Sequence, residues 1–326
     1  MVKFSRRNFL RGASGAAALP VLSRAVSAQA YPTRSVLLLV GYAAGGPTDI
    51  CARLISQWLS QRLGQQLVVE NRTGAGSNIA TEAAIHADPD GYTLLLVTQS
   101  NAINTTLYPH LKFNFIEGIV PIAGIMQAPS VLEVNPSVPV KSVAEFITYA
   151  KANPGKINLG TAGNGSPPHM FAELFMYMTG VKLAVVGYRG GGPALVDLIG
   201  GQVQVMFEGI TSSIGYLKAG KLRPLGVTTT QRLAVLPDVP AIAETVPDYE
   251  ATIYVGIAAP RGSPAAIVDT LSKQIVAAAF DPKMMARITE LGDTPEPLAT
   301  PAFEKLVVAE AQKWAQVIKT AGVRAE

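Results

Sequence analysis

The sequence predicts an α/β fold divided into two lobes. Strand-like and helix-like segments alternate along the chain, an order that is typical of parallel sheets covered by helices. The alternation restarts in the middle of the chain, and two extended segments, 122–134 and 251–258, stand where the chain would cross between lobes. We therefore expect residues 31–131 and 253–326 to form lobe 1, residues 132–252 to form lobe 2, and a ligand cleft to lie between the lobes.

The first strand, loop and helix follow one another at the start of lobe 1. Apolar residues fill 35–40, glycines are frequent in 41–48, and apolar residues then recur at helical spacing until Gly64. A short apolar run, a glycine-rich loop and a periodic segment that stops at glycine indicate strand, loop and helix. Two further strands and an intervening helix are expected at 67–70, 92–97 and 78–86, respectively.

The second half of the chain repeats this order. Ser142 and Glu145 form a capping-box signature for a helix that ends near Ala152. Ser263-Pro264 and Thr300-Pro301 each place an N-cap residue before proline, which predicts the start of two long helices, with a shorter one between them near 282–291. The strands expected in this half are 157–160, 183–186, 203–207 and 222–228.

Residues 1–30 are expected to be a cleavable export signal. Four basic residues precede a weakly apolar stretch, which is about half of the roughly 20 residues that span a bilayer and contains Pro20. This favours a cleaved signal over a permanent anchor. The run Ser5-Arg6-Arg7-Asn8-Phe9-Leu10 resembles the twin-arginine class. We expect export to the periplasm, with cleavage near Ala28 or Ala30.

Charge and cysteine content exclude several classes of partner. The expected signal contains five of the 27 Lys and Arg residues and none of the 23 Asp and Glu residues, which leaves 22 basic and 23 acidic residues. No basic cluster remains in the body of the chain, so we expect no nucleic-acid partner. Cys51 is the single cysteine, which excludes an internal disulfide and thiolate metal clusters, and its apolar surroundings predict a buried structural thiol.

Three glycine-rich loops, 41–48, 160–169 and 187–193, each follow an expected strand and open an expected helix. Glycine lets the backbone approach a ligand closely, and the free N–H groups of a first helical turn lie at the positive end of the helix dipole. In open α/β sheets, ligands bind at this strand-to-helix edge. One such loop alone is equally well explained as a tight turn, whereas three together favour an anion site.

Side chains suited to catalysis are few. The three histidines, His86, His110 and His169, are far apart in sequence and have no metal-ligand spacing, and no nucleophile elbow or complete nucleotide-binding motif is present. We expect His169 to donate a hydrogen bond to ligand or to cap its helix. Glu208, which follows an apolar strand, is either a structural acceptor or a polar contact in the cleft. We expect no enzyme activity, cofactor or metal; the competing hypothesis is an exported hydrolase or isomerase that uses His169 and Glu208.

Seven short motifs occur in order along the chain, at 42–49, 69–76, 89–94, 198–203, 219–223, 236–240 and 259–260. Together they resemble the extracytoplasmic receptors of tripartite tricarboxylate transporters, the Bug-type or TctC-like family, over essentially the whole chain after the signal. Two positions depart from the family pattern. Glu208 and Gly209 stand where the family usually has Asp-Asn, and Ala44 stands where proline often precedes the double glycine.

The resemblance implies a type II periplasmic binding-protein fold that closes on a small mono- or dicarboxylate and delivers it to integral-membrane transporter subunits. We expect a monomer; a receptor for a membrane sensor is an alternative with the same fold. The residues that the resemblance implies at the ligand are Ala43, Ala44, Gly45, Gly46, Thr48, Asp49, Ser100, Asn101, Thr161, Ala162, Gly163, Asn164, Ser166, His169, Tyr188 and Arg189, to which we add Glu208.

Overall fold

The computed structural model of this chain describes residues 31–321 and 323. The expected export signal, residues 1–30, lies outside the described residues. Among the helices that the structure describes, none is both long enough and apolar enough to cross a membrane.

Ten strands within the described residues form one mixed sheet. They are β1 (Val36–Val40), β2 (Leu67–Asn71), β3 (Thr93–Val97), β4 (Ile119–Val134), β5 (Asn158–Thr161), β6 (Ala184–Gly187), β7 (Val205–Gly209), β8 (Arg223–Val227), β9 (Thr252–Pro260) and β10 (Thr294–Ala299). The order across the sheet is β2, β1, β3, β9, β4, β7, β5, β6, and β8 and β10 also pair with β4.

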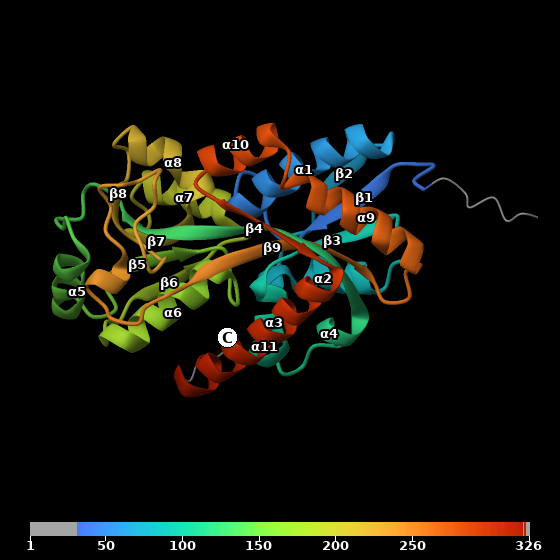
Figure 1. The fold of residues 1–326 in the computed structure, drawn as a ribbon. Helices are drawn as coiled ribbons and strands as arrows, with labels where there is room; N and C mark the ends of the chain where they lie inside the picture. The colour runs from blue at the N-terminus through green and yellow to red at the C-terminus, as the bar shows by residue number, and fades with distance from the viewer. Residues whose placement is uncertain (1–30, 322, 324–326) are drawn as a thin grey trace, which may run out of the picture.

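Helices cover the sheet on both sides (Figure 1). They are α1 (Pro47–Leu63), α2 (Asn78–Ile85), α3 (Gln99–Leu107), α4 (Phe115–Gly118), α5 (Val143–Ala152), α6 (Pro167–Thr179), α7 (Gly191–Ile199), α8 (Ile210–Lys218), α9 (Ala265–Ala278), α10 (Pro282–Glu290) and α11 (Thr300–Ala321), with short 3₁₀ turns η1 (Ala75–Ser77) and η2 (Ile242–Glu244). Several begin and end where the sequence predicts: Ser142 caps α5 by accepting from the Glu145 amide, and Gly64 ends α1 in the left-handed region at φ 70°.

Two long strands join the two halves of the molecule. In Figure 1, β4 and β9 pass through the centre, with β1, β2 and β3 at one end and β5, β6, β7 and β8 at the other. Strand β4 pairs with β9 as far as Pro129 and then, from Ser130, with β7. The chain therefore changes partners in mid-strand, which builds two lobes on one continuous sheet and confirms the predicted fold class.

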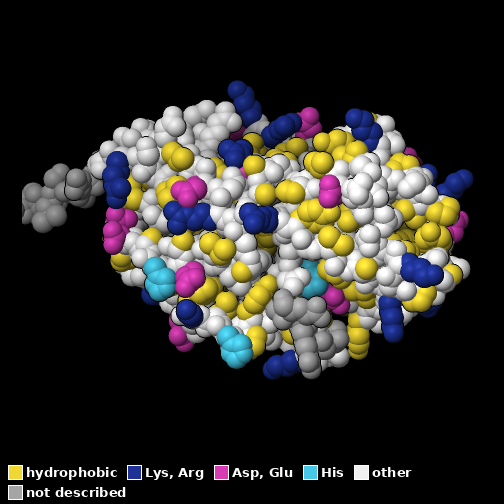
Figure 2. All heavy atoms as spheres, turned by 180° about the vertical axis from the view of Figure 1, so that it is seen from behind, with side chains coloured by type: hydrophobic (Ala, Val, Ile, Leu, Met, Phe, Trp, Pro, Cys, Tyr) yellow, Lys and Arg dark blue, Asp and Glu magenta, His cyan; other side chains and the backbone are white. Residues whose placement is uncertain are grey.

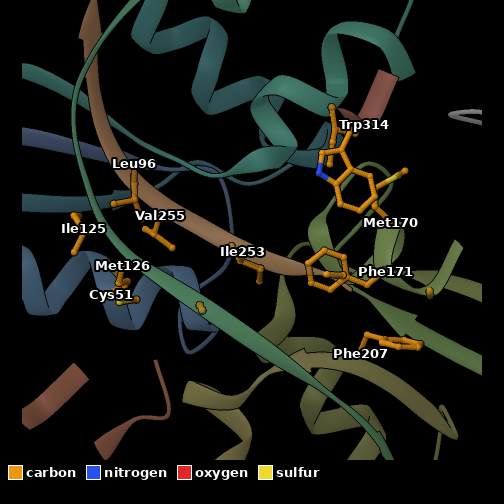
Figure 3. Close-up of a cluster of buried hydrophobic side chains, with 14 of the residues drawn as sticks. Cys51, Leu96, Ile125, Met126, Met170, Phe171, Phe207, Ile253, Val255 and Trp314 are labelled. Atoms are coloured by element: carbon orange, nitrogen blue, oxygen red, sulfur yellow. The ribbon is translucent and has the colours of Figure 1, made fainter. Parts of the chain in front are cut away.

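The buried core runs through both halves. In Figure 3, Cys51 and Met126 pack together at one end of the cluster, and Trp314 lies beside Met170 and Phe171 at the other. The Trp314 ring of α11 stacks on the Phe171 ring of α6, with centroids 6.0 Å apart and an interplanar angle of 25°. Because α11 also packs against α3, the C-terminal helix contacts elements of both halves.

Two local expectations need correction. Parallel pairing holds for β1 with β2 and β3 and for β5 with β6 and β7, but β4 and β9 are antiparallel to their neighbours, so the sheet is mixed. Pro264 is the N-cap of α9 rather than its first residue. Strand β10 gave no sequence signal, because Pro295 and Pro297 interrupt it and its pairing with β4 is irregular, as is usual for proline in edge strands.

Candidate functional site

The three predicted loops each end at a helix N-terminus. Gly46 is the N-cap of α1, Ser166 that of α6 and Gly190 that of α7. The Ser166 hydroxyl accepts from the His169 amide, while the two glycines provide no side-chain cap. The first turns of α1 and α7 have no capping side chain, so their N–H groups are available for a ligand. Helix α6 begins with Pro167 and Pro168, which have no N–H, so it contributes only the positive end of its dipole.

The first turns of α1, α6 and α7 meet around a small cavity, here called the inner chamber. Its volume is about 20 Å³, roughly the space of one water molecule. Its lining residues are Tyr42, Gly46, Pro47, Thr48, Ala162, Pro167, Pro168, Gly191, Glu208 and Ile253. Three helix N-termini from both halves of the molecule thus surround one enclosed space, an arrangement that favours an anionic group.

A second, more open space adjoins the chamber and is here called the outer cavity. Its volume is about 840 Å³, within the range of small-molecule sites. Its lining residues are Gly41, Gly74, Ala75, Gly76, Ser77, Tyr108, Ala162, Gly163, Asn164, His169, Glu173, Val185, Gly187, Tyr188 and Arg189. Ala162 lines both spaces, so the two lie next to each other at this residue.

The two halves contact each other around these spaces. The Ala43 amide donates to the Arg189 carbonyl oxygen at 3.0 Å, and the Tyr108 hydroxyl donates to the Asn164 carbonyl oxygen at 3.1 Å. Gly76 has no room for a side chain, because a Cβ atom there would overlap the Asn164 carbonyl oxygen. The loops of the two halves are therefore closed upon each other.

Several loop amides already bond within the protein. The Gly45 amide donates to Asp49 Oδ2 at 3.1 Å, the Gly163 amide to Thr161 Oγ1 at 3.3 Å, and the Gly165 amide to His169 Nδ1 at 3.2 Å. These bonds shape the loops rather than leave donors for a ligand. The amides of these three glycines are therefore not free donors.

Three of the expected ligand contacts, Ser100, Asn101 and Asp49, form hydrogen bonds within the protein. The Ser100 hydroxyl accepts from the Tyr42 hydroxyl at 2.6 Å, and Asn101 completes the cap of α3 and donates to the Thr81 hydroxyl at 2.8 Å. Asp49 also accepts from Arg53 and Asn71. Burial acts to raise the pKa of Asp49, but these hydrogen bonds hold it below its usual value. None of the three expected contacts is among the residues that line the two cavities.

One histidine, His169, and one arginine, Arg189, line the outer cavity. His169 is buried; its Nδ1 accepts from the Gly165 amide, and its Nε2 lies 3.3 Å from Glu173 Oε1. Arg189 is exposed, and its carbonyl oxygen makes the contact with Ala43. A cationic side chain therefore stands at the solvent end of the outer cavity.

Glu208 is a structural acceptor and also lines a cavity. It is fully buried at the end of β7, and Ser212 Oγ donates to its Oε1 at 2.7 Å, so it is a structural acceptor. It also lines the inner chamber. Burial raises the pKa of this carboxyl group to about 7.

The sequence did not single out Tyr42, Ile253, Tyr108 or Glu173, although all four line one of the two cavities. Tyr42 stands within the first glycine loop and Ile253 within a predicted crossing segment, so position gave a signal for these two. Tyr108 and Glu173 reach the cavity through tertiary packing, and no local pattern marks them.

Charged side chains are spread thinly over the surface. Figure 2 shows Lys, Arg, Asp and Glu scattered singly or in small groups over the face that it presents, without a dense basic area. Within the described residues, no group of three or more His, Cys, Asp or Glu side chains is placed to hold a metal ion.

Comparisons with known proteins agree with this architecture. Residues 51–323 match the family model for the tripartite tricarboxylate transporter family receptor. Protein BugT of Bordetella pertussis is 34% identical over 303 residues, which cover 92% of this chain and 93% of BugT. Among solved structures, R. palustris Rpa4515 with adipate is 36% identical with a TM-score of 0.88, covering 90% of this chain and 99% of that chain.

MatC from Rhodopseudomonas palustris with bound malate is similar at 32% identity and a TM-score of 0.85, covering 88% of this chain and 100% of that chain. Each of these likenesses extends over most of the chain. This chain belongs to the tripartite tricarboxylate transporter receptor family, the Bug-type periplasmic binding proteins.

Proposed function

We propose that this protein binds a small mono- or dicarboxylate between its lobes and delivers it unchanged to the membrane subunits of a tripartite tricarboxylate-type transporter. The observation that carries the proposal is the meeting of three helix N-termini, at Gly46, Pro167 and Gly191, around the inner chamber. The adipate of Rpa4515 and the malate of MatC support a carboxylate as the ligand class.

In the proposed binding mode, one carboxylate enters the inner chamber and the rest of the ligand extends past Ala162 into the outer cavity, toward Arg189. The inner chamber has room for about one water molecule in the closed arrangement, so the lobes must separate to admit a carboxylate. We propose lobe 1 as residues 31–131 and 253–326 and lobe 2 as residues 132–252, with β4 and β9 as the connections about which they move.

Transport without catalysis is supported by the surroundings of the two candidate catalytic side chains. Both ring nitrogens of His169 are engaged, by the Gly165 amide and by Glu173, and Glu208 lines a different cavity. A general base must lie within hydrogen-bond reach of the proton that it takes, whereas both nitrogens of His169 already have partners within the protein. We further propose a monomer, exported to the periplasm with its signal removed near Ala28 or Ala30.

A thermal-shift screen of purified protein against linear, hydroxy, amino and aromatic carboxylates tests the binding function. At about one hundred times Kd, a ligand adds about 2.7 kcal/mol to the free energy of unfolding, which raises Tm by about 5 °C or more in a protein of this size. The matched primary amides, which lack the negative charge, serve as controls. Absence of a shift with every acid, checked by calorimetry, would contradict the proposal.

A further inference from the structure

One oxygen of Glu208 is buried without a hydrogen-bond partner. Ser212 satisfies Oε1, but Oε2 has no partner anywhere in residues 31–321, and the side chain is fully buried. A buried acceptor left without a donor is costly, more so when the group is charged. Such an atom beside a cavity is an acceptor that a donor on a ligand can reach.

The unpartnered oxygen belongs to a carboxyl group on the wall of the inner chamber. A Cβ atom at Gly191 would lie 2.5 Å from Glu208 Oε1 and 2.9 Å from Oε2, so the carboxyl group lies directly against the first residue of α7. Gly46 approaches the same turn from α1, since a Cβ atom there would lie 3.5 Å from the Gly191 amide nitrogen. Donors at the helix N-termini and an acceptor at Glu208 thus share one small space.

No cation neutralises Glu208 within the described part of the chain. A second acid, Glu133 of β4, is also fully buried and accepts from Ser213; burial raises its pKa, and the nearby Glu208 raises it further. The other side chains that line the chamber are apolar, such as Ile253 and Pro168, or uncharged, namely Tyr42 and Thr48. The side chains that line the chamber include no cation, so Glu208 Oε2 remains open to a donor on the ligand.

Given the proposed carboxylate-binding function, on which this step rests, we propose that Glu208 selects a carboxylate that carries a hydroxyl or ammonium group on the carbon next to the carboxyl carbon. The carboxylate faces the helix N-termini, and the neighbouring donor is directed to Glu208 Oε2. The two groups must be close together in the ligand because the first turn of α7 and the carboxyl group of Glu208 lie directly against each other. An unsubstituted acid would leave Oε2 without a donor.

Isothermal titration calorimetry with matched acids tests this selection. The probes are propionate, lactate and alanine, and succinate, malate and aspartate, all measured at pH 8, where most Glu208 is ionised. We expect at least one substituted acid to bind about tenfold or more tightly than its unsubstituted parent, because a hydrogen bond to a charged group has this strength. Equal affinity for parents and substituted acids would overturn the inference and leave the proposed function standing; no binding by any acid would overturn both.

Two variants attribute the preference to Glu208. Glu208→Gln removes the charge, so the preference for the amino acid should fall about tenfold or more, and Glu208→Leu removes the acceptor, so the preference for the hydroxy acid should fall as well. Glu133→Gln is the matched control, because Glu133 is equally buried and equally bonded to a serine but does not line the chamber. Thermal unfolding confirms that each variant is folded. Loss of preference to the same extent in Glu133→Gln, or unchanged preference in both Glu208 variants, would overturn the inference.

Discussion

Asp293 should make the protein less stable as the pH rises from 5 to 7. This residue lies between α10 and β10 with 3% of its surface exposed, and Thr211 Oγ1 of α8 donates to its Oδ2 at 2.6 Å. Burial raises the pKa of Asp293 from 3.8 to about 7. The folded protein therefore keeps this acid protonated in a pH range where the unfolded chain has already lost the proton.

The sign and size of the effect follow from proton linkage. Between pH 4 and pH 7 the folded state binds more protons at Asp293 than the unfolded state, so the free energy of unfolding falls as pH rises through this range. One pKa unit corresponds to about 1.4 kcal/mol, and partial ionisation at each end of the range leaves a loss on the order of 2 kcal/mol between pH 5 and pH 7. Below about pH 3, where the unfolded chain is also protonated at this residue, the contribution no longer changes.

Urea unfolding of the wild type and of Asp293→Asn at pH 5, 6 and 7 measures this contribution. The asparagine can still accept from Thr211 but cannot ionise, so its free energy of unfolding should fall by about 2 kcal/mol less than that of the wild type over the range. Taking the difference cancels every other titrating group. Asp269→Asn, which changes an exposed acid on α9, should keep the wild-type slope. Parallel lines for wild type and Asp293→Asn would refute the reasoning.

Three further predictions concern ligand binding and the stability of the fold. Gly46→Val should weaken ligand binding far more than folding, because the added side chain would press on the first turn of α7 and hold the lobes apart. The control is Gly215→Val, at a helix position with open space around it. Titration calorimetry measures the affinity of each variant, and scanning calorimetry measures its thermal stability. Trp314→Ala should lower the free energy of unfolding by about 3–5 kcal/mol by emptying the contact with Phe171, as measured in urea. Arg189→Ala should reduce affinity for dicarboxylates while leaving Tm unchanged, which titration and thermal unfolding would show together.

Local patterns predicted the elements that local interactions determine. The apolar run of β1, the helical spacing of α1 and its glycine stop all lie within one stretch of chain, and the structure keeps them. Strand β10 could not be predicted, because it depends on pairing with β4 across a long sequence separation and contains two prolines. Antiparallel pairing of β4 with β9 is likewise a tertiary property that periodicity does not report.

The candidate site was predictable in its backbone and less so in its side chains. Glycines before Pro47 and within 160–169 mark loops that must approach something closely, and these loops line the two cavities. The orientation of Glu208 toward the chamber could not be derived, because an acid after an apolar strand is compatible with either a structural or a ligand-facing role. Tyr108 and Glu173 depend on how the two halves meet, which no single segment encodes.

The first turn of α8 forms hydrogen bonds both to Glu208, which lines the inner chamber, and to Asp293 of the other half. Three consecutive hydroxyl residues each donate to a different buried carboxyl group: Thr211 to Asp293, Ser212 to Glu208 and Ser213 to Glu133. Glu133 lies on β4, which joins the halves, whereas Asp293 comes from the half opposite α8. One rigid helical turn cannot move for one of these acids without straining its bonds to the others. The hydroxyl group that bonds Glu208 at the inner chamber and the hydroxyl group that bonds Asp293 of the other half therefore belong to adjacent residues of one helical turn.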